Sequence, residues 1–337
     1  MKFGKSILQL LAAAALALGS APATLAADND LGSGPDAASF FTKDYAKAVD
    51  AAYPRFDSAR LMERLEAIRK LPAAQLDPLK LRTLPQLESA LQVARATPRK
   101  GSDYVSNDQY AARVEAASGR IRLVKKSAAL LPAAYDEAAR VKERVGKDHQ
   151  EFLAMIGLDQ PQILFLQTGL TSLRDDKAVA AGDTVPAAPR NDQDGALVDG
   201  VFTYALRSVD GIMVEGSVAK LTSAASGELI GVDLRWPALA YHPALRSLAL
   251  KDADTMKKAI LAHVEQAANG EEVSVQMAVV LRPVKISGRR AYVPALKVGM
   301  LPRTSEGEMF FVDLPRQALK YDADNLADTV AVRSVRR

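Results

Sequence analysis

The segment that most constrains the fold lies near the C-terminus, where every second residue of Val273–Leu281 is apolar. Successive side chains of a β-strand point to opposite faces, so this alternation predicts a strand with one buried face. The turn sequences Ser287-Gly288 and Glu306-Gly307 then separate two further strand candidates, 291–301 and 309–314. Connections this short join neighbouring antiparallel strands, so this part of the chain is predicted to form an antiparallel sheet.

Helical patterns dominate the N-terminal part of the chain, which we assign to residues 39–117. Asp57 is a residue type that caps helices, and the leucines and isoleucine of 61–68 follow it at helical spacing. Thr83-Leu-Pro-Gln86 matches a capping box, in which the first and last side chains each accept a backbone hydrogen bond from the other residue. This part is therefore predicted to contain several short helices.

Strands and helices alternate in the rest of the chain. A long helix is predicted over 131–156, and a second one starts at Asp252 or Asp254 and ends at Asn269-Gly270. Phe202, Tyr204 and Leu206 alternate with Thr203 and Arg207, which predicts another strand. Further strand candidates are 119–126, 162–173 and 230–236. The predicted class is α+β: a helical N-terminal part, then an antiparallel sheet with helices packed on one face.

These patterns divide the chain into seven segments. They are a signal peptide at 1–26, a flexible lead at 27–38, the helical region at 39–117, a first αβ half at 119–174, a linker loop at 175–196, a second αβ half at 197–315 and a C-terminal tail at 316–337.

The first 26 residues have the features of a secretory signal peptide. Lys2 and Lys5 precede an apolar run at 7–18, and Thr24 and Ala26 place small residues where a signal peptidase cleaves. The run is shorter than the roughly 20 residues that span a bilayer, and no later stretch is apolar for that length. The mature protein is therefore expected to be periplasmic or secreted, without a membrane span.

Charge and composition exclude several classes of function. The net charge of +4 falls to +2 without Lys2 and Lys5, and basic residues alternate with acidic ones, so nucleic-acid binding is not expected. The chain has no cysteine, hence no disulfide and no thiolate metal site, and none of the common nucleophile, zinc or phosphate-loop motifs occurs. No cofactor is predicted.

A few residues remain as candidates for function. Arg235 and Trp236 are the predicted binding residues, because Arg and Trp are enriched at binding hot spots, although a buried Trp is the alternative. His149 lies on the apolar stripe of its helix and is interpreted as a packing residue, and His263 flanks the stripe of the later helix. His242 is assigned to a turn, and the carboxylate pair Asp175-Asp176 to the start of a solvated loop.

Residues 119–315 resemble the PepSY and FTP units that precede thermolysin-like metalloproteases and have a cystatin-like fold. The resemblance rests on Val198–Tyr204, Val209–Ser217 and Ser226–Gly231, followed by the helix at 254–266 and two long strands. Since no protease sequence follows in this chain, the resemblance implies a stand-alone module that binds a protein, as an inhibitor or folding helper.

The expected function is thus an exported, non-enzymatic protein that recognises a protein or peptide partner. An antiparallel sheet with an accessible edge can accept an additional strand from such a partner. Two alternatives stay open: a periplasmic hydrolase that uses carboxylates or His149, and a structural component of the cell envelope.

Overall fold

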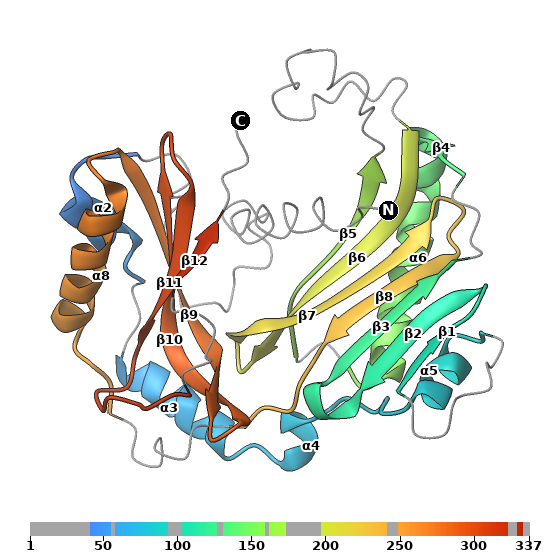
Figure 1. The fold of residues 1–337 in the computed structure, drawn as a ribbon, viewed down its shortest axis with the longest axis horizontal. Helices are drawn as coiled ribbons and strands as arrows, with labels where there is room; N and C mark the ends of the chain where they lie inside the picture. Colours follow the sequence, from blue (N-terminus) through green and yellow to red (C-terminus); the bar gives the residue numbers. More distant parts are fainter. Residues whose placement is uncertain are drawn as a thin grey trace. The chain divides into compact units, whose positions relative to one another are not determined.

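The structure is a computed structural model that describes residues 41–54, 58–93, 103–126, 131–158, 162–172, 197–240, 249–322 and 329–332 (Figure 1). It has the α+β class: short N-terminal helices precede a mixed, mostly antiparallel set of strands on which helices pack. Several predictions lie outside the described residues, namely the signal peptide, the flexible lead, Asp57, Asp175-Asp176, the linker 175–196 and His242.

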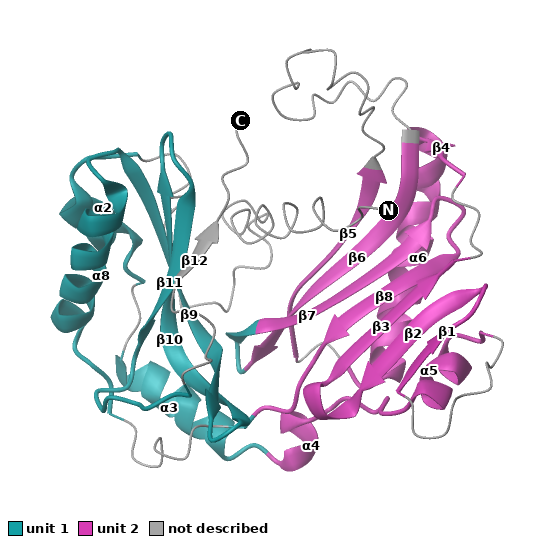
Figure 2. Cartoon of the chain, in the orientation of Figure 1, with its two compact units in different colours: residues 1–71, 210–215, 240–336 teal, residues 72–209, 216–239, 337 magenta. Residues whose placement is uncertain are grey.

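The chain forms two compact units (Figure 2). Unit 1 contains residues 1–71, 210–215 and 240–336, and unit 2 contains residues 72–209 and 216–239. The predicted second αβ half, 197–315, is therefore divided between the two units. Its strands before residue 240 belong mainly to unit 2, whereas its later helix and strands belong to unit 1.

Unit 1 packs helices on an antiparallel meander. Its sheet consists of β9 (Val273–Ile286), β10 (Arg289–Pro302), β11 (Gly307–Asp313) and β12 (Thr329–Val332), and Met213 and Val214 of β7 pair with β9 in parallel. The predicted helix is α8 (Ala253–Ala268), whose N-cap Asp252 accepts a bond from the Thr255 amide and whose C-cap is Asn269. The Ser287-Gly288 turn joins β9 to β10, with both residues at positive φ, as predicted.

The N-terminal helices of unit 1 pack against the C-terminal half of the chain. Helix α2 (Tyr45–Ala52) lies beside α8 and β9 (Figure 1). The Tyr45 hydroxyl donates to the Glu271 carbonyl at 2.9 Å, and Lys257 forms an ion pair with Asp50. In α3 (Ser58–Arg69), the predicted stripe of Leu61, Leu65 and Ile68 is fully buried.

Unit 2 is a twisted antiparallel sheet with strand order β1-β2-β3-β8-β7-β6-β5. The β6–β7 hairpin turns at Asp210-Gly211, both at positive φ. The strands are β1 (Tyr104–Ser106), β2 (Tyr110–Glu115), β3 (Arg120–Lys125), β5 (Ile163–Ser172), β6 (Leu197–Val209), β7 (Ile212–Ala224) and β8 (Leu229–Arg235), with the short β4 (Ala133–Ala134) paired to the start of β6. Its helices are α4 (Ala73–Leu76), α5 (Leu84–Ala90), the 3-10 turn η3 (Ala116–Ser118) and α6 (Tyr135–Met155).

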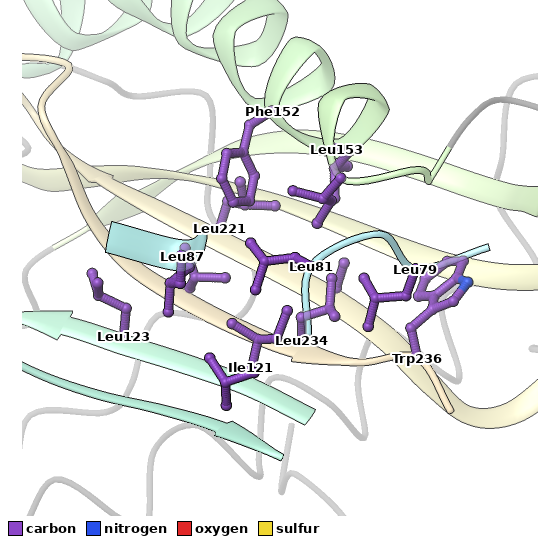
Figure 3. Packing of buried hydrophobic residues seen from close by; sticks show 14 of the residues in the cluster. Leu79, Leu81, Leu87, Ile121, Leu123, Phe152, Leu153, Leu221, Leu234 and Trp236 are labelled. Atoms are coloured by element: carbon purple, nitrogen blue, oxygen red, sulfur yellow. The ribbon is translucent and has the colours of Figure 1, made fainter. Parts of the chain in front are cut away.

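One face of this sheet carries the core of unit 2 (Figure 3). Alternate residues of β2, β3, β7 and β8 point toward α6, α5 and the segment Leu79–Leu84 that leads into α5. The predicted capping box at the start of α5 is present, with Thr83 and Gln86 each accepting from the backbone of the other. The strands therefore have one face that is covered by α6, α5 and Leu79–Leu84 and an opposite face that is not covered by these segments.

Two predicted boundaries are wrong. The helical region does not extend to residue 117, because residues 104–106 and 110–115 are strands β1 and β2. The buried positions of β2 are Tyr110, Ala112 and Val114, and their alternation is weak in sequence because one of them is alanine. The expected C-terminal tail contains strand β12, and within it the Asp322 carboxylate accepts bonds from the Ser287 and Gly288 amides.

Candidate functional site

Arg235 and Trp236, the predicted binding pair, lie at the end of β8 and point in opposite directions. The Arg235 side chain is exposed on the face of the sheet away from α6. Trp236 is 0% exposed and packs among Leu79, Leu234 and their neighbours in the core (Figure 3). The structure thus favours the alternative reading of Trp236 as a core residue and leaves Arg235 as the accessible member of the pair.

A buried guanidinium adjoins the indole of Trp236. Arg207 of β6 is 0% exposed, and its guanidinium carbon lies 5.5 Å from the centroid of the Trp236 ring. Its nitrogens donate to the Pro237 carbonyl at 2.6 Å, the Leu76 carbonyl at 3.1 Å and the Gln162 side-chain oxygen at 3.2 Å. Burial of a charge requires such hydrogen bonds, and here they join β6 to the segments that follow α4 and β8.

Gln162 links the two large side chains of this network. Its oxygen accepts a bond from the Trp236 indole at 3.5 Å as well as the bond from Arg207, and its amide donates to the Gln75 carbonyl at 2.8 Å. All these groups lie inside unit 2 and form hydrogen bonds with one another. The network is therefore a structural one, which fixes how the chain enters β5 and leaves β8.

His149 forms a second buried polar cluster, between α6 and the sheet. Its Nδ1 lies 2.8 Å from the Thr203 hydroxyl and its Nε2 lies 2.9 Å from the Ser223 hydroxyl. Thr203 in turn lies 2.9 Å from the Thr168 hydroxyl. Burial disfavours the charged imidazole and lowers the pKa of His149 to about 4, although the nearby Asp148 carboxylate acts in the opposite direction.

In the His149 cluster, the imidazole and the serine hydroxyl are as close as a catalytic base and its nucleophile. Solvent and substrate nevertheless have no access to them. An imidazole within hydrogen-bonding distance of a serine hydroxyl can activate that hydroxyl for attack on a carbonyl. His149 is 2% exposed, however, and Ser223 and Thr203 are fully buried. A substrate carbonyl cannot reach Ser223 in this conformation, and His149 lies buried against the sheet, as its place on the apolar stripe of the helix predicted.

Strand β5 is one edge of the unit 2 sheet. Within the part of the chain that the structure describes, β5 pairs only with β6, through a register that runs from Ile163–Arg207 to Ser172–Val198. Its sequence, ILFLQTGLTS, contains no charged residue and no proline. Proteins usually blunt a strand edge with charges, proline, bulges or very short strands. Strand β5 is long and has no charge or proline, and its register with β6 shifts only near its two ends, between Ile163 and Phe165 and between Thr171 and Ser172.

The remaining sequence candidates form no further site. His263 of α8 lies 3.2 Å from the Glu308 carboxylate and is one-third exposed, with its ring against Phe310. Among the described residues, no group of three or more His, Cys, Asp or Glu side chains is placed to hold a metal ion. No helix in the same residues is long and apolar enough to cross a membrane.

Sequence reasoning missed the buried Arg207 and the hydroxyl partners of His149. A charged residue in an alternating strand normally indicates a solvent-facing position, so Arg207 gave no signal of burial. The hydroxyl partners lie 54 and 74 residues from His149 in sequence, on β6 and β7, and only the fold brings them together. Neither a protein-family model nor a curated protein matches this chain, so the geometry alone has to support a function.

Proposed function

We propose that the mature protein is an exported binding protein that accepts an extended segment of a partner protein as an additional strand along β5. The observation that supports this proposal is the long, uncharged, proline-free edge of β5. Main-chain hydrogen bonds from such an edge give affinity, and side chains that alternate between the two faces of the added strand give specificity.

The opposite edge of the unit 2 sheet is less suited to strand addition. Strand β1 has only three residues, Tyr104–Ser106, and so offers few main-chain groups. Strand β5 has ten residues, and Thr168 bonds to Thr203 on β6 while α6 packs against the same face of the strand. A rigid edge loses little conformational entropy when it accepts a partner, so β5 is the better template.

We propose in addition that the protein is PepSY-like in fold and that residues 1–26 direct its export. A helix laid across an antiparallel sheet, as α6 is across β5 and β6, is the arrangement that the PepSY and cystatin-like resemblance implies. Protein binding without catalysis also agrees with the role that this resemblance implies. The sheet edge is then the functional part of the unit, and α6 is its support.

Export gives a direct expectation for the N-terminus. The protein recovered from the envelope fraction of a bacterial host should begin at Ala27, because Thr24 and Ala26 satisfy the cleavage rule. Intact-mass spectrometry measures this directly. A full-length mass would show that residues 1–26 are retained and would remove export from the proposed function.

Strand addition is tested with a charge placed on the edge. Gln167 is exposed on β5, so Gln167→Lys should leave the free energy of unfolding within about 0.5 kcal/mol of the wild type. The new ammonium disfavours strand pairing and should weaken binding by roughly tenfold. The probe is a display library of random decapeptides, selected on the wild-type mature protein and then measured by titration against each variant.

Gln150→Lys on the exposed side of α6 is the matched control, since it makes the same chemical change in the same unit away from β5. It should bind the selected peptides as the wild type does. Hydrogen exchange should also show that the bound peptide protects alternate amides of β5. Equal binding by wild type and Gln167→Lys, or protection confined to other strands, contradicts the proposal.

A further inference from the structure

The face of the unit 2 sheet that points away from α6 carries a cluster of cations, which we call the basic face. Buried residues alternate with exposed or half-buried ones along β2, β3, β8 and the part of β7 after Gly216, and every second residue therefore points to this face. The cations of the basic face are Arg113 on β2, Arg120 and Arg122 on β3, Lys220 on β7 and Arg235 on β8.

The sheet register places like charges directly opposite each other. Arg113 is the partner of Arg122, and Arg120 is the partner of Arg235. Like charges at directly opposed positions destabilise a sheet, because their Cβ atoms are only about 5 Å apart. Folding alone gives no reason for two such pairs, whereas an anionic ligand would be stabilised by both.

The carboxylates on the basic face neutralise only part of its charge. Arg113 forms an ion pair with Glu115 at 2.8 Å, and Arg122 forms one with Asp233 at 3.3 Å. The side chains of Arg113 and Arg122 nevertheless remain 54% exposed. The side chains of Arg120 and Arg235 form no hydrogen bond or ion pair with any residue that the structure describes, although the backbones of both residues pair within the sheet. The opposed pair Arg120 and Arg235 is thus the centre of the uncompensated charge.

The spacing of these groups matches an extended polypeptide. Arg120 and Arg122 are two residues apart on β3, which separates them by about 7 Å along the strand. Alternate side chains of an extended peptide have the same repeat, so acidic residues at every second position would meet successive arginines. The planar guanidinium group binds a carboxylate through two parallel hydrogen bonds.

Two exposed apolar side chains adjoin the arginines. Tyr104 is 51% exposed and is the register partner of Arg113, and Val124 is 60% exposed and follows Arg122 on the same face of β3. Tyrosine and arginine are the residue types enriched at the centres of protein interfaces. The mixture of arginines with exposed apolar side chains on a sheet surface favours an extended peptide as the occupant.

We propose that the basic face binds an extended acidic segment of a protein, with Arg120 and Arg235 as its principal contacts. This site is separate from the β5 edge, because β8, β7 and β6 lie between β3 and β5 in the sheet. The inference therefore does not depend on strand addition. It extends the binding role of Arg235 that its residue type alone predicts.

The test uses the mature full chain and a labelled decapeptide in which glutamate alternates with threonine. Fluorescence anisotropy should detect binding that weakens as NaCl is raised from 50 to 200 mM, and the same peptide with glutamine for glutamate should not bind. The double variant Arg120→Gln/Arg235→Gln should lose at least about tenfold in affinity. Arg289→Gln/Arg290→Gln removes the same charge from exposed residues of unit 1 and should change affinity less than about twofold.

A thermal melt separates ligand binding from a structural role. Relief of the opposed charges should leave the melting temperature of Arg120→Gln/Arg235→Gln unchanged or raise it. A lower melting temperature, or an equal loss of affinity in the unit 1 control, overturns the proposal. Binding to phosphatidylglycerol vesicles without binding to the acidic peptide also overturns it. Gln167→Lys should bind the acidic peptide normally, so failure of strand addition and failure of this inference are distinguishable.

Discussion

Arg207→Met should lower the free energy of unfolding of unit 2 by about 3–5 kcal/mol. The substitution keeps an unbranched stem but removes the donors to the Pro237 and Leu76 carbonyls and to Gln162. The Leu76 carbonyl keeps the Leu239 amide as a donor and the Gln162 oxygen keeps the Trp236 indole, so the Pro237 carbonyl is the acceptor left without a donor among the described residues, at a cost of about 1–3 kcal/mol. The two other bonds from the guanidinium and the contact of the cation with the Trp236 ring are lost as well. Trp236 is the only tryptophan of the chain, so urea unfolding followed by its fluorescence reports on this network.

Two further variants identify the cause of that loss. Arg207→Lys retains the charge but lacks the planar fork that reaches three acceptors, so its stability should lie between those of wild type and Arg207→Met. Arg235→Met makes the same replacement at an exposed position of the same unit and should change the stability by no more than about 0.5 kcal/mol. A cost below about 1 kcal/mol for Arg207→Met would mean that the bonds of the guanidinium, including the one to the Pro237 carbonyl, contribute little to the stability of unit 2.

Acid should destabilise unit 2 through His149. Its pKa is about 4 in the folded state against 6.5 for the ordinary imidazole, so between these values the unfolded chain binds a proton that the folded chain excludes. The stabilisation is complete above pH 6.5 and decreases as the pH falls toward 4. Between pH 7 and 4, this residue alone should remove about 3 kcal/mol from the free energy of unfolding.

His149→Gln is the control for the acid effect, because glutamine can bond to Thr203 and Ser223 but does not titrate. Carboxylates contribute to acid unfolding in both proteins, so the quantity to compare is the difference between their pH dependences. Urea titrations at intervals from pH 7 to 4 provide it. If the two curves run parallel, the buried imidazole has no role in the pH dependence.

The strands and helices were largely predictable, because strong periodicity survives in the sequence. The alternating apolar residues of Val273–Leu281 lie in β9 as predicted, although Ser274 and Val280 on the other face are buried as well, so β9 does not have only one buried face. The Asp252 cap and the Asn269 terminus of α8 follow from local hydrogen-bonding chemistry. Strand β2 was missed because a small residue, Ala112, occupies one of its three buried positions and weakens the contrast with its neighbours.

The orientation of β6 shows why the sites were harder to predict. Its alternation was visible, but Thr203 and Arg207 are the residues that face α6, whereas Phe202, Tyr204 and Leu206 are only half-buried. Periodicity shows that a strand has two different faces, but it does not show which of the two is covered by a helix. Hydrogen-bond partners on other strands decided it here: His149 holds Thr203, and two backbone carbonyls hold Arg207.

The division of the chain between the units has a consequence for the order in which a growing chain can fold. Unit 2 is complete once residue 239 has been synthesised, whereas unit 1 needs β9 to β11, which come later. Helix α2, near the start of the chain, must wait for α8 and β9 before its apolar side has a partner. Such a long delay between the first and last segments of one core leaves apolar surface exposed during synthesis, the period in which a holding chaperone protects a nascent chain.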